Sequence, residues 1–200
     1  MKIPAAAPIM ALVCLLSACG SSPASNYYLL SVHNPVPPDG DRPSLGIGPI
    51  EIPEYLNRSG MVSNHSNNQL EISSVNHWAE PLTDGINRVI SLSLASQLNT
   101  EDVQSYPWAH SRAPEYGVRI TLLELDANRN EAVLVAEWAV LKPRDGGMVT
   151  RQISQLIEQV GVQQLTAADM AQAYSKLLNQ LSTIIGETIR EDMQKDTTSS

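Results

Sequence analysis

The stretch from Val133 to Leu141 limits most strongly how this chain can fold, because it is apolar at nearly every position. A strand of this kind is expected to lie in the middle of a sheet and to be covered on both faces. Residues 116–126 precede it with a strand pattern, and Asp126 to Asn130 supply a turn between the two. We therefore predict a pair of adjacent strands at the centre of the domain.

Two amphipathic helices are predicted from apolar residues at helical spacing. The first begins near Pro81, whose missing N–H suits the first turn of a helix. Its apolar face contains Leu82, Ile86, Val89, Ile90, Leu94 and Leu98. The second covers residues 166–193, about 42 Å at 1.5 Å per residue, and starts with a capping box formed by Thr166 and Asp169. Its apolar face contains Met170, Tyr174, Leu177, Leu178, Leu181, Ile184, Ile185 and Ile189. A single apolar stripe indicates that each helix covers a sheet or another helix.

Shorter strands are predicted at 27–32 and 45–52 and in a hairpin formed by 61–63 and 69–72. A shift of apolar parity near Pro49 indicates a bulge or a bend in the second of these strands. The segment 148–157 fits a strand, and it also fits a helix. Together these elements predict an α/β fold of the α+β type. It is a single domain with a largely antiparallel or mixed sheet and two amphipathic helices, the second long and C-terminal.

The N-terminal segment has the features of a secretory signal peptide: a basic residue, the apolar run 9–16 and small residues just before Cys19. The run is too short to cross a bilayer core, which takes about 20 apolar residues. Leu16 to Cys19 reads Leu-Ser-Ala-Cys and resembles the bacterial lipobox, in which a peptidase cuts before a cysteine that carries the lipid. We expect residues 1–18 to be removed and Cys19 to be lipidated. The alternative is an ordinary signal peptide that happens to contain a cysteine.

This expectation divides the chain into four parts, which are the signal peptide 1–18, the lipidated cysteine and its tether 19–26, the domain 27–193 and a polar, frayed tail 194–200. Seven residues separate Cys19 from the first predicted strand at Tyr27, and at ~3.4 Å each they reach at most about 24 Å. The domain is therefore expected to stay close to the leaflet that holds its lipid.

Charge and cysteine content exclude several classes of function. The chain has a net charge of −8 and, because Lys2 is the only charged residue in 1–18, a net charge of −9 after the signal is removed. This balance argues against nucleic-acid binding and against a polybasic attachment to anionic lipid. The only cysteines are Cys14 and Cys19, so the processed chain is expected to fold on its hydrophobic core without a disulfide.

No pattern in the sequence supports an enzyme, a cofactor or a metal site. No Gly-rich phosphate loop or G-x-S-x-G motif is present, and the four histidines, His33, His65, His77 and His110, lack metal-ligand spacing. Glu124 and Glu137 lie in adjacent predicted strands and could approach each other as paired carboxylates. The preferred alternative is that each points outward or pairs with Arg119 or Arg129.

Five motifs occur in order along the chain, namely the lipobox, Tyr27–Leu30, Ile52–Leu56, Trp78–Leu82 and Glu137–Trp138. In this combination the chain resembles the PqiC family of auxiliary lipoproteins of MCE-type, ABC-linked intermembrane transport systems. The resemblance covers the whole mature domain and implies a non-enzymatic periplasmic domain without a cofactor, held at the outer membrane. It also implies an MCE-domain protein that forms a lipid-conducting tube, with a permease and an ATPase, as partners, and assembly of this chain into a homo-oligomeric ring. An Asp at position 20 would resemble the inner-membrane retention signal. The residue at that position is Gly20, which favours the outer membrane.

Two hypotheses of different classes follow. In the first, the protein is a docking subunit that receives the transport tube, and Tyr55, Leu56, Met61 and Trp78 are candidate partner or packing contacts. In the second, it is a monomeric lipid-binding carrier with a pocket between the long helix and the sheet. A filled helix–sheet interface would argue against the carrier.

Overall fold

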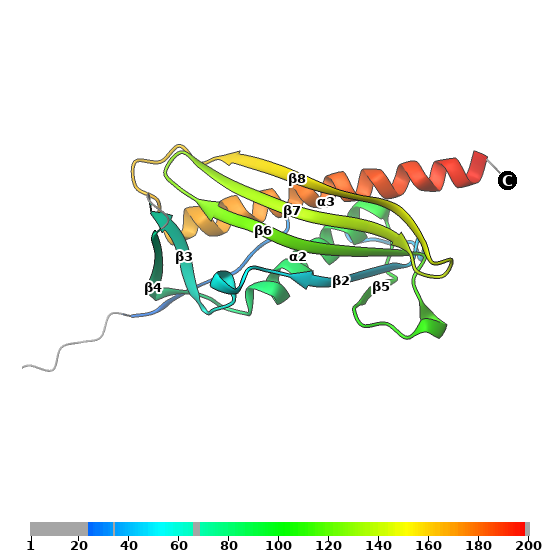
Figure 1. The fold of residues 1–200 in the computed structure, drawn as a ribbon, viewed down its shortest axis with the longest axis horizontal. Helices are drawn as coiled ribbons and strands as arrows, with labels where there is room; N and C mark the ends of the chain where they lie inside the picture. Colours follow the sequence, from blue (N-terminus) through cyan, green and yellow to red (C-terminus); the bar gives the residue numbers. More distant parts are fainter. Residues whose placement is uncertain (1–23, 34, 66–68, 199–200) are drawn as a thin grey trace, which may run out of the picture.

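The computed structural model describes residues 24–33, 35–65 and 69–198. This part of the chain forms two sheets and two long helices in one domain, which confirms the predicted α+β class (Figure 1). The large sheet has the order β5-β2-β6-β7-β8, and the small sheet, β1-β4-β3, lies at one end of the molecule. The single sheet expected from the sequence is thus divided in two.

The strands of the large sheet are β5 (Val103–Ser105), β2 (Leu45–Glu51), β6 (Tyr116–Ala127), β7 (Glu131–Lys142) and β8 (Gly147–Gln159). Those of the small sheet are β1 (Asn26–Tyr28), β4 (Gln69–Trp78) and β3 (Gly60–His65), and the helices are α2 (Leu82–Leu98) and α3 (Ala167–Thr198). Short 3₁₀ turns are present at η1 (Glu54–Leu56) and η2 (His110–Arg112). Both sheets mix parallel and antiparallel pairs, since β2 is parallel to β5 and β6, and β1 is parallel to β4.

The predicted central strand β7 does pair with β6 on one side and β8 on the other. Segment 148–157, which also fitted a helix, lies within strand β8. The expectation that β7 is covered on both faces is wrong. Its side chains alternate between buried Leu134 and Ala136 and half-buried Val133 and Val135, because both helices lie on the same side of the sheet (Figure 1). The outer face is shielded only by neighbouring strands, where Val133 pairs with Ile157.

Strand β2 contains the predicted irregularity near Pro49. Its register with β6 shifts between Ile47 and Ile50, and Gly48 there has a φ of +113°. A positive φ of this size is open to glycine and strained for other residues. The bulge therefore depends on Gly48 as well as on the proline.

Helix α2 confirms the predicted start and apolar face. Pro81 is its N-cap, and all six predicted apolar residues are buried. The helix ends at Asn99, which has a left-handed backbone and donates its N–H to the carbonyl oxygen of Ala95. Asn is one of the few non-glycine residues that adopt this conformation readily.

Helix α3 begins with the predicted capping box. The Asp169 carboxylate accepts the Thr166 N–H at 3.0 Å, and the Thr166 hydroxyl accepts the Asp169 N–H at 3.2 Å. The helix also continues to Thr198, through residues that the sequence pattern assigned to a frayed tail. Lys142 of β7 contacts this part of the helix, since its Nζ lies 2.7 Å from Asp192 and 2.6 Å from Asp196.

The interface between α3 and the sheet is filled by large apolar side chains. Leu177, Leu178, Leu181 and Ile185 have no solvent-accessible surface and belong to one continuous core with the inner face of the sheet. Close packing of this kind leaves no ligand-sized space between the helix and the sheet.

Strand β4 is longer than the predicted segment because a bulge interrupts its alternation. The Ser73 hydroxyl accepts the N–H groups of Val75 at 3.3 Å and Asn76 at 2.9 Å. The register with β3 shifts over the same stretch, between Gly60 and Val62. Odd-numbered residues before the bulge and even-numbered residues after it consequently share one face of the small sheet.

Candidate functional site

The predicted lipidation site, Cys19, lies outside the described residues. The described chain begins at Ala24, at the end of the molecule that carries the small sheet (Figure 1). Asn26 then enters β1 and pairs with Asn76 of β4, and their side-chain amides are joined by a hydrogen bond of 3.1 Å. The start of the domain is therefore fixed to the small sheet.

The four predicted contact residues lie between this end and the core. Leu56, Met61 and Trp78 are buried, and Tyr55 is half-buried. The Trp78 ring lies 6.3 Å, centroid to centroid, from the Tyr174 ring of α3, so it links β4 to the long helix. Burial favours a packing role for Leu56, Met61 and Trp78 over direct contact with a partner.

Tyr55 lies beside a hollow of about 340 Å³ between β3, β4 and β6, which Leu70, Leu123 and Asp126 also line. Burial raises the pKa of the Tyr55 hydroxyl, although a hydrogen bond with the Leu125 backbone opposes this shift. The hydroxyl therefore stays protonated at neutral pH and acts as a hydrogen-bonding group.

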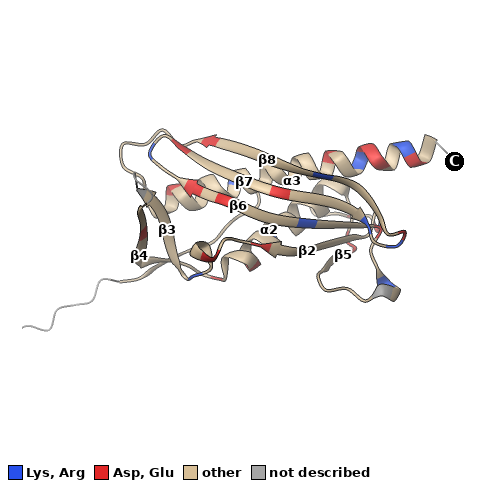
Figure 2. Cartoon of the chain, viewed as in Figure 1, with Lys and Arg blue, Asp and Glu red and all other residues tan. Residues whose placement is uncertain are grey.

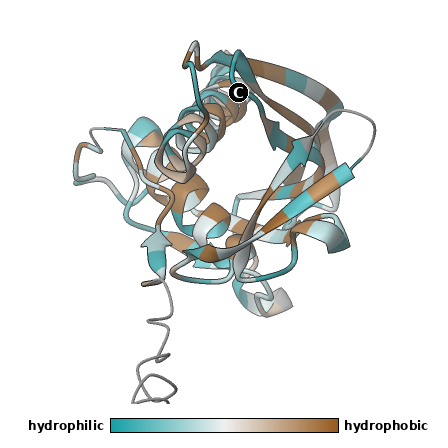
Figure 3. Cartoon of the chain, turned by 90° about the vertical axis from the view of Figure 1, so that its left-hand side faces the viewer, coloured by the Kyte–Doolittle hydropathy of each residue, from teal (hydrophilic) through white to brown (hydrophobic). Residues whose placement is uncertain are grey.

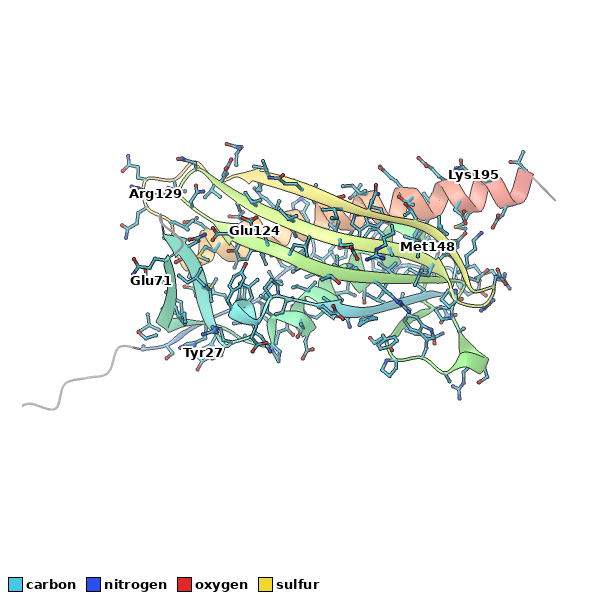
Figure 4. All side chains as sticks on the ribbon, in the orientation of Figure 1. Tyr27, Glu71, Glu124, Arg129, Met148 and Lys195 are labelled. Atoms are coloured by element: carbon cyan, nitrogen blue, oxygen red, sulfur yellow. The ribbon has the colours of Figure 1, made fainter. Side chains whose placement is uncertain are left out.

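A larger cleft of about 630 Å³ lies between the small sheet, the β6–β7 turn and the segment before α3. Buried Met61 and Met170 contribute to its lining. Its polar lining includes Ser63, Glu71, Ser73, Asn76, Arg129 and Gln163. Figure 4 shows Glu71 and Arg129 at the same end of the molecule. These residues come from four separate segments, so no local pattern in the sequence could indicate the cleft.

The two hollows differ from a metal site in the side chains that line them. Among the described residues that line them there is no histidine or cysteine, and the described ranges contain no group of three or more metal-ligating side chains. Glu124 and Glu137 are not paired, because Glu124 lies opposite Val135 and Glu137 opposite Thr121. Glu137 instead forms an ion pair with Arg151 at 2.7 Å.

Charged residues of both signs are spread along the large sheet and α3 (Figure 2). Several are paired across elements, such as Lys176 of α3 with Glu158 of β8 at 2.8 Å. Of the helices in the described part, none has both the length and the apolar character needed to cross a membrane.

Comparison with known proteins places the chain in a family. The family model described as "ABC-type transport auxiliary lipoprotein component" matches residues 27–186. An uncharacterised protein of known crystal structure has 20% sequence identity and a TM-score of 0.66, over 84% of this chain and 99% of its own. A Xanthomonas campestris protein of family DUF330 has 15% identity and a TM-score of 0.67, over 85% and 99%. A search of curated proteins finds no match.

The chain belongs to the family of ABC-type transport auxiliary lipoproteins, whose model covers nearly all of the domain. The similar structures show that the fold is shared. The family is not a known enzyme family, and its members are auxiliary, membrane-anchored parts of a transport system.

Proposed function

We propose that this protein is a non-enzymatic lipoprotein, anchored to the outer membrane by Cys19, that docks the tube of an MCE-domain protein and supports membrane integrity. The permease and ATPase of the same system complete the transport path. Several copies of the chain surround the tube end as a homo-oligomeric ring, so that lipid reaches the leaflet without crossing water.

The observation that carries this proposal is the combination of family membership with a short tether. The family model begins at Tyr27, and the described chain begins at the end that carries the small sheet. At most about 24 Å of extended chain separates Cys19 from Asn26. A domain held so closely suits a fixed docking port better than a shuttle.

The monomeric carrier is the alternative, and the helix–sheet interface argues against it. A carrier needs an apolar cavity large enough for acyl chains, and such pockets typically measure 300 to 1,000 Å³. The space between α3 and the sheet is filled by Leu177, Leu178 and Leu181. The 630 Å³ cleft is lined largely by polar groups, and the 340 Å³ hollow includes the carboxylates of Glu124 and Asp126 beside its apolar residues, so both suit acyl chains poorly.

Native mass spectrometry of the lipidated protein after mild detergent extraction distinguishes the two functions. We expect an oligomer whose mass is a multiple of the lipidated chain, without a stoichiometric bound phospholipid. A monomer that carries one phospholipid would contradict the docking ring and support the carrier.

A further inference from the structure

One face of the small sheet carries several exposed apolar side chains at the end where the described chain begins, beside polar Asn64 and buried Val62. The exposed fractions are 68% for Tyr27, 55% for Leu29, 42% for Leu70 and 50% for Ile72. Figure 3 looks onto this end of the molecule and shows hydrophobic segments alternating with hydrophilic ones along its strands. We call these four residues the tether-end face.

Register and parity place Tyr27, Leu70 and Ile72 on the same side of the sheet. Glu71 and Asn76 line the cleft, so Leu70 and Ile72 before the bulge, and His77 after it, point the other way. His77 pairs with Tyr27, and the two rings lie 5.7 Å apart. Leu29 follows directly where β1 ends.

The length of chain before the domain identifies what can cover this face. Cys19 is seven residues from Asn26, which pairs with β4 beside the tether-end face. Acyl chains on Cys19 would therefore hold the leaflet within about 24 Å of β1. Half-exposed aliphatic side chains gain free energy when apolar surface leaves water, and tyrosine is enriched where membrane meets water.

We propose that the tether-end face rests on the membrane leaflet that holds the acyl chains of Cys19, with Tyr27, Leu29, Leu70 and Ile72 in its interfacial region. This inference rests on the anchoring proposed above. The occupant is a phospholipid surface. The acidic chain is held there by apolar contact, because the net charge of −9 after removal of 1–18 opposes attraction to anionic lipid.

Charged side chains lie on both sides of the small sheet, and Glu124 and Asp126 line the hollow beside Leu70 on the side of the proposed contact. Glu71 lines the cleft on the opposite face of the sheet from Leu70 and Ile72, so the acidic side chain lies off the contact surface. Arg129 lines the same cleft as Glu71, so it lies off the contact surface as well.

This contact would set the orientation of the whole domain relative to the membrane. The C-terminal end of α3 and the β7–β8 turn lie at the opposite end of the long axis (Figure 1). With the small sheet on the leaflet, they point away from the membrane. A partner that arrives from the other membrane would meet that end first.

Spin labelling of the lipidated full-length protein in phosphatidylethanolamine and phosphatidylglycerol vesicles tests the inference. With Cys14 removed and Cys19 acylated, one introduced cysteine is the only free thiol. Leu70→Cys and Ile72→Cys report on the tether-end face. Met148→Cys, 59% exposed at the other end, is the matched control. Circular dichroism confirms that each variant is folded.

The measured quantity is the accessibility of each label to a water-soluble nickel complex. We expect it to be about tenfold lower at residues 70 and 72 than at 148, because hydrocarbon excludes a polar complex. Equal accessibility in protein that sediments with the vesicles would overturn the membrane contact and leave the anchoring intact. Protein that fails to sediment would contradict the anchoring, and the inference with it. Labels that are exposed on vesicles and protected only by an added protein partner would assign the face to that partner instead.

Discussion

Trp138→Ala is expected to reduce the free energy of unfolding by about 3–5 kcal/mol, the usual loss when a buried tryptophan is truncated to alanine. Trp138 is 1% exposed in the middle of β7, and its indole N–H donates to the Ser154 hydroxyl at 3.0 Å. The substitution removes the largest fully buried side chain in the domain and leaves the hydroxyl without its partner. Domains of this kind are stable by about 5–15 kcal/mol in total.

Urea-induced unfolding measures this loss, and Ile153→Ala is the matched control. Ile153 lies in the neighbouring strand β8 and is 62% exposed, so its truncation is expected to change the free energy by at most about 1 kcal/mol. Similar losses for the two variants would show that Trp138 does not contribute to the core as the structure indicates.

Gly46→Ala is expected to destabilise the domain by about 1–3 kcal/mol, because it places a methyl group in filled space. A Cβ at this position would lie 2.5 Å from Pro114 Cγ and 2.7 Å from Trp108 Cζ3. The Trp108 ring also lies over Gly117, the residue that pairs with Gly46 in β6. The loop between β5 and β6 can pack on the sheet only because both strands carry glycine there.

Thermal unfolding compares this variant with Gly147→Ala, whose Cβ would find its nearest neighbour 3.8 Å away at Lys142. We expect a lower melting temperature for Gly46→Ala and little change for Gly147→Ala. Equal melting temperatures for Gly46→Ala and the unaltered protein would refute the close contact between Trp108 and β2.

The long amphipathic elements were predictable because their signals are local. The apolar faces of α2 and α3, the capping box at Thr166 and the bulge near Pro49 each depend on residues a few positions apart. The outer limits of the elements were less predictable. The predicted strand ends at Ile72 because the bulge at Ser73 inverts the alternation of β4, and the last turns of α3 contact Lys142, a residue distant in sequence.

Pairing between segments that are distant along the chain produces no local pattern in the sequence from which it could be predicted. The parallel contact of Asn26 with Asn76, which forms the small sheet, joins residues fifty positions apart. The same holds for the cleft, which is lined by residues as distant in sequence as Met61 and Arg129. A largely apolar strand such as β7 indicates a central place in a sheet, and says nothing about which elements cover each face.

The anchored docking role is tested most directly by Cys19→Ala in cells that contain the complete transport system. Unaltered and variant protein are expressed at equal levels, and two quantities are measured: membrane integrity and the MCE-domain protein that co-purifies with the outer-membrane fraction. We predict that Cys19→Ala folds normally, leaves the outer membrane, no longer brings the MCE-domain protein to that fraction and fails to support membrane integrity. Full function from the non-lipidated variant would contradict the account.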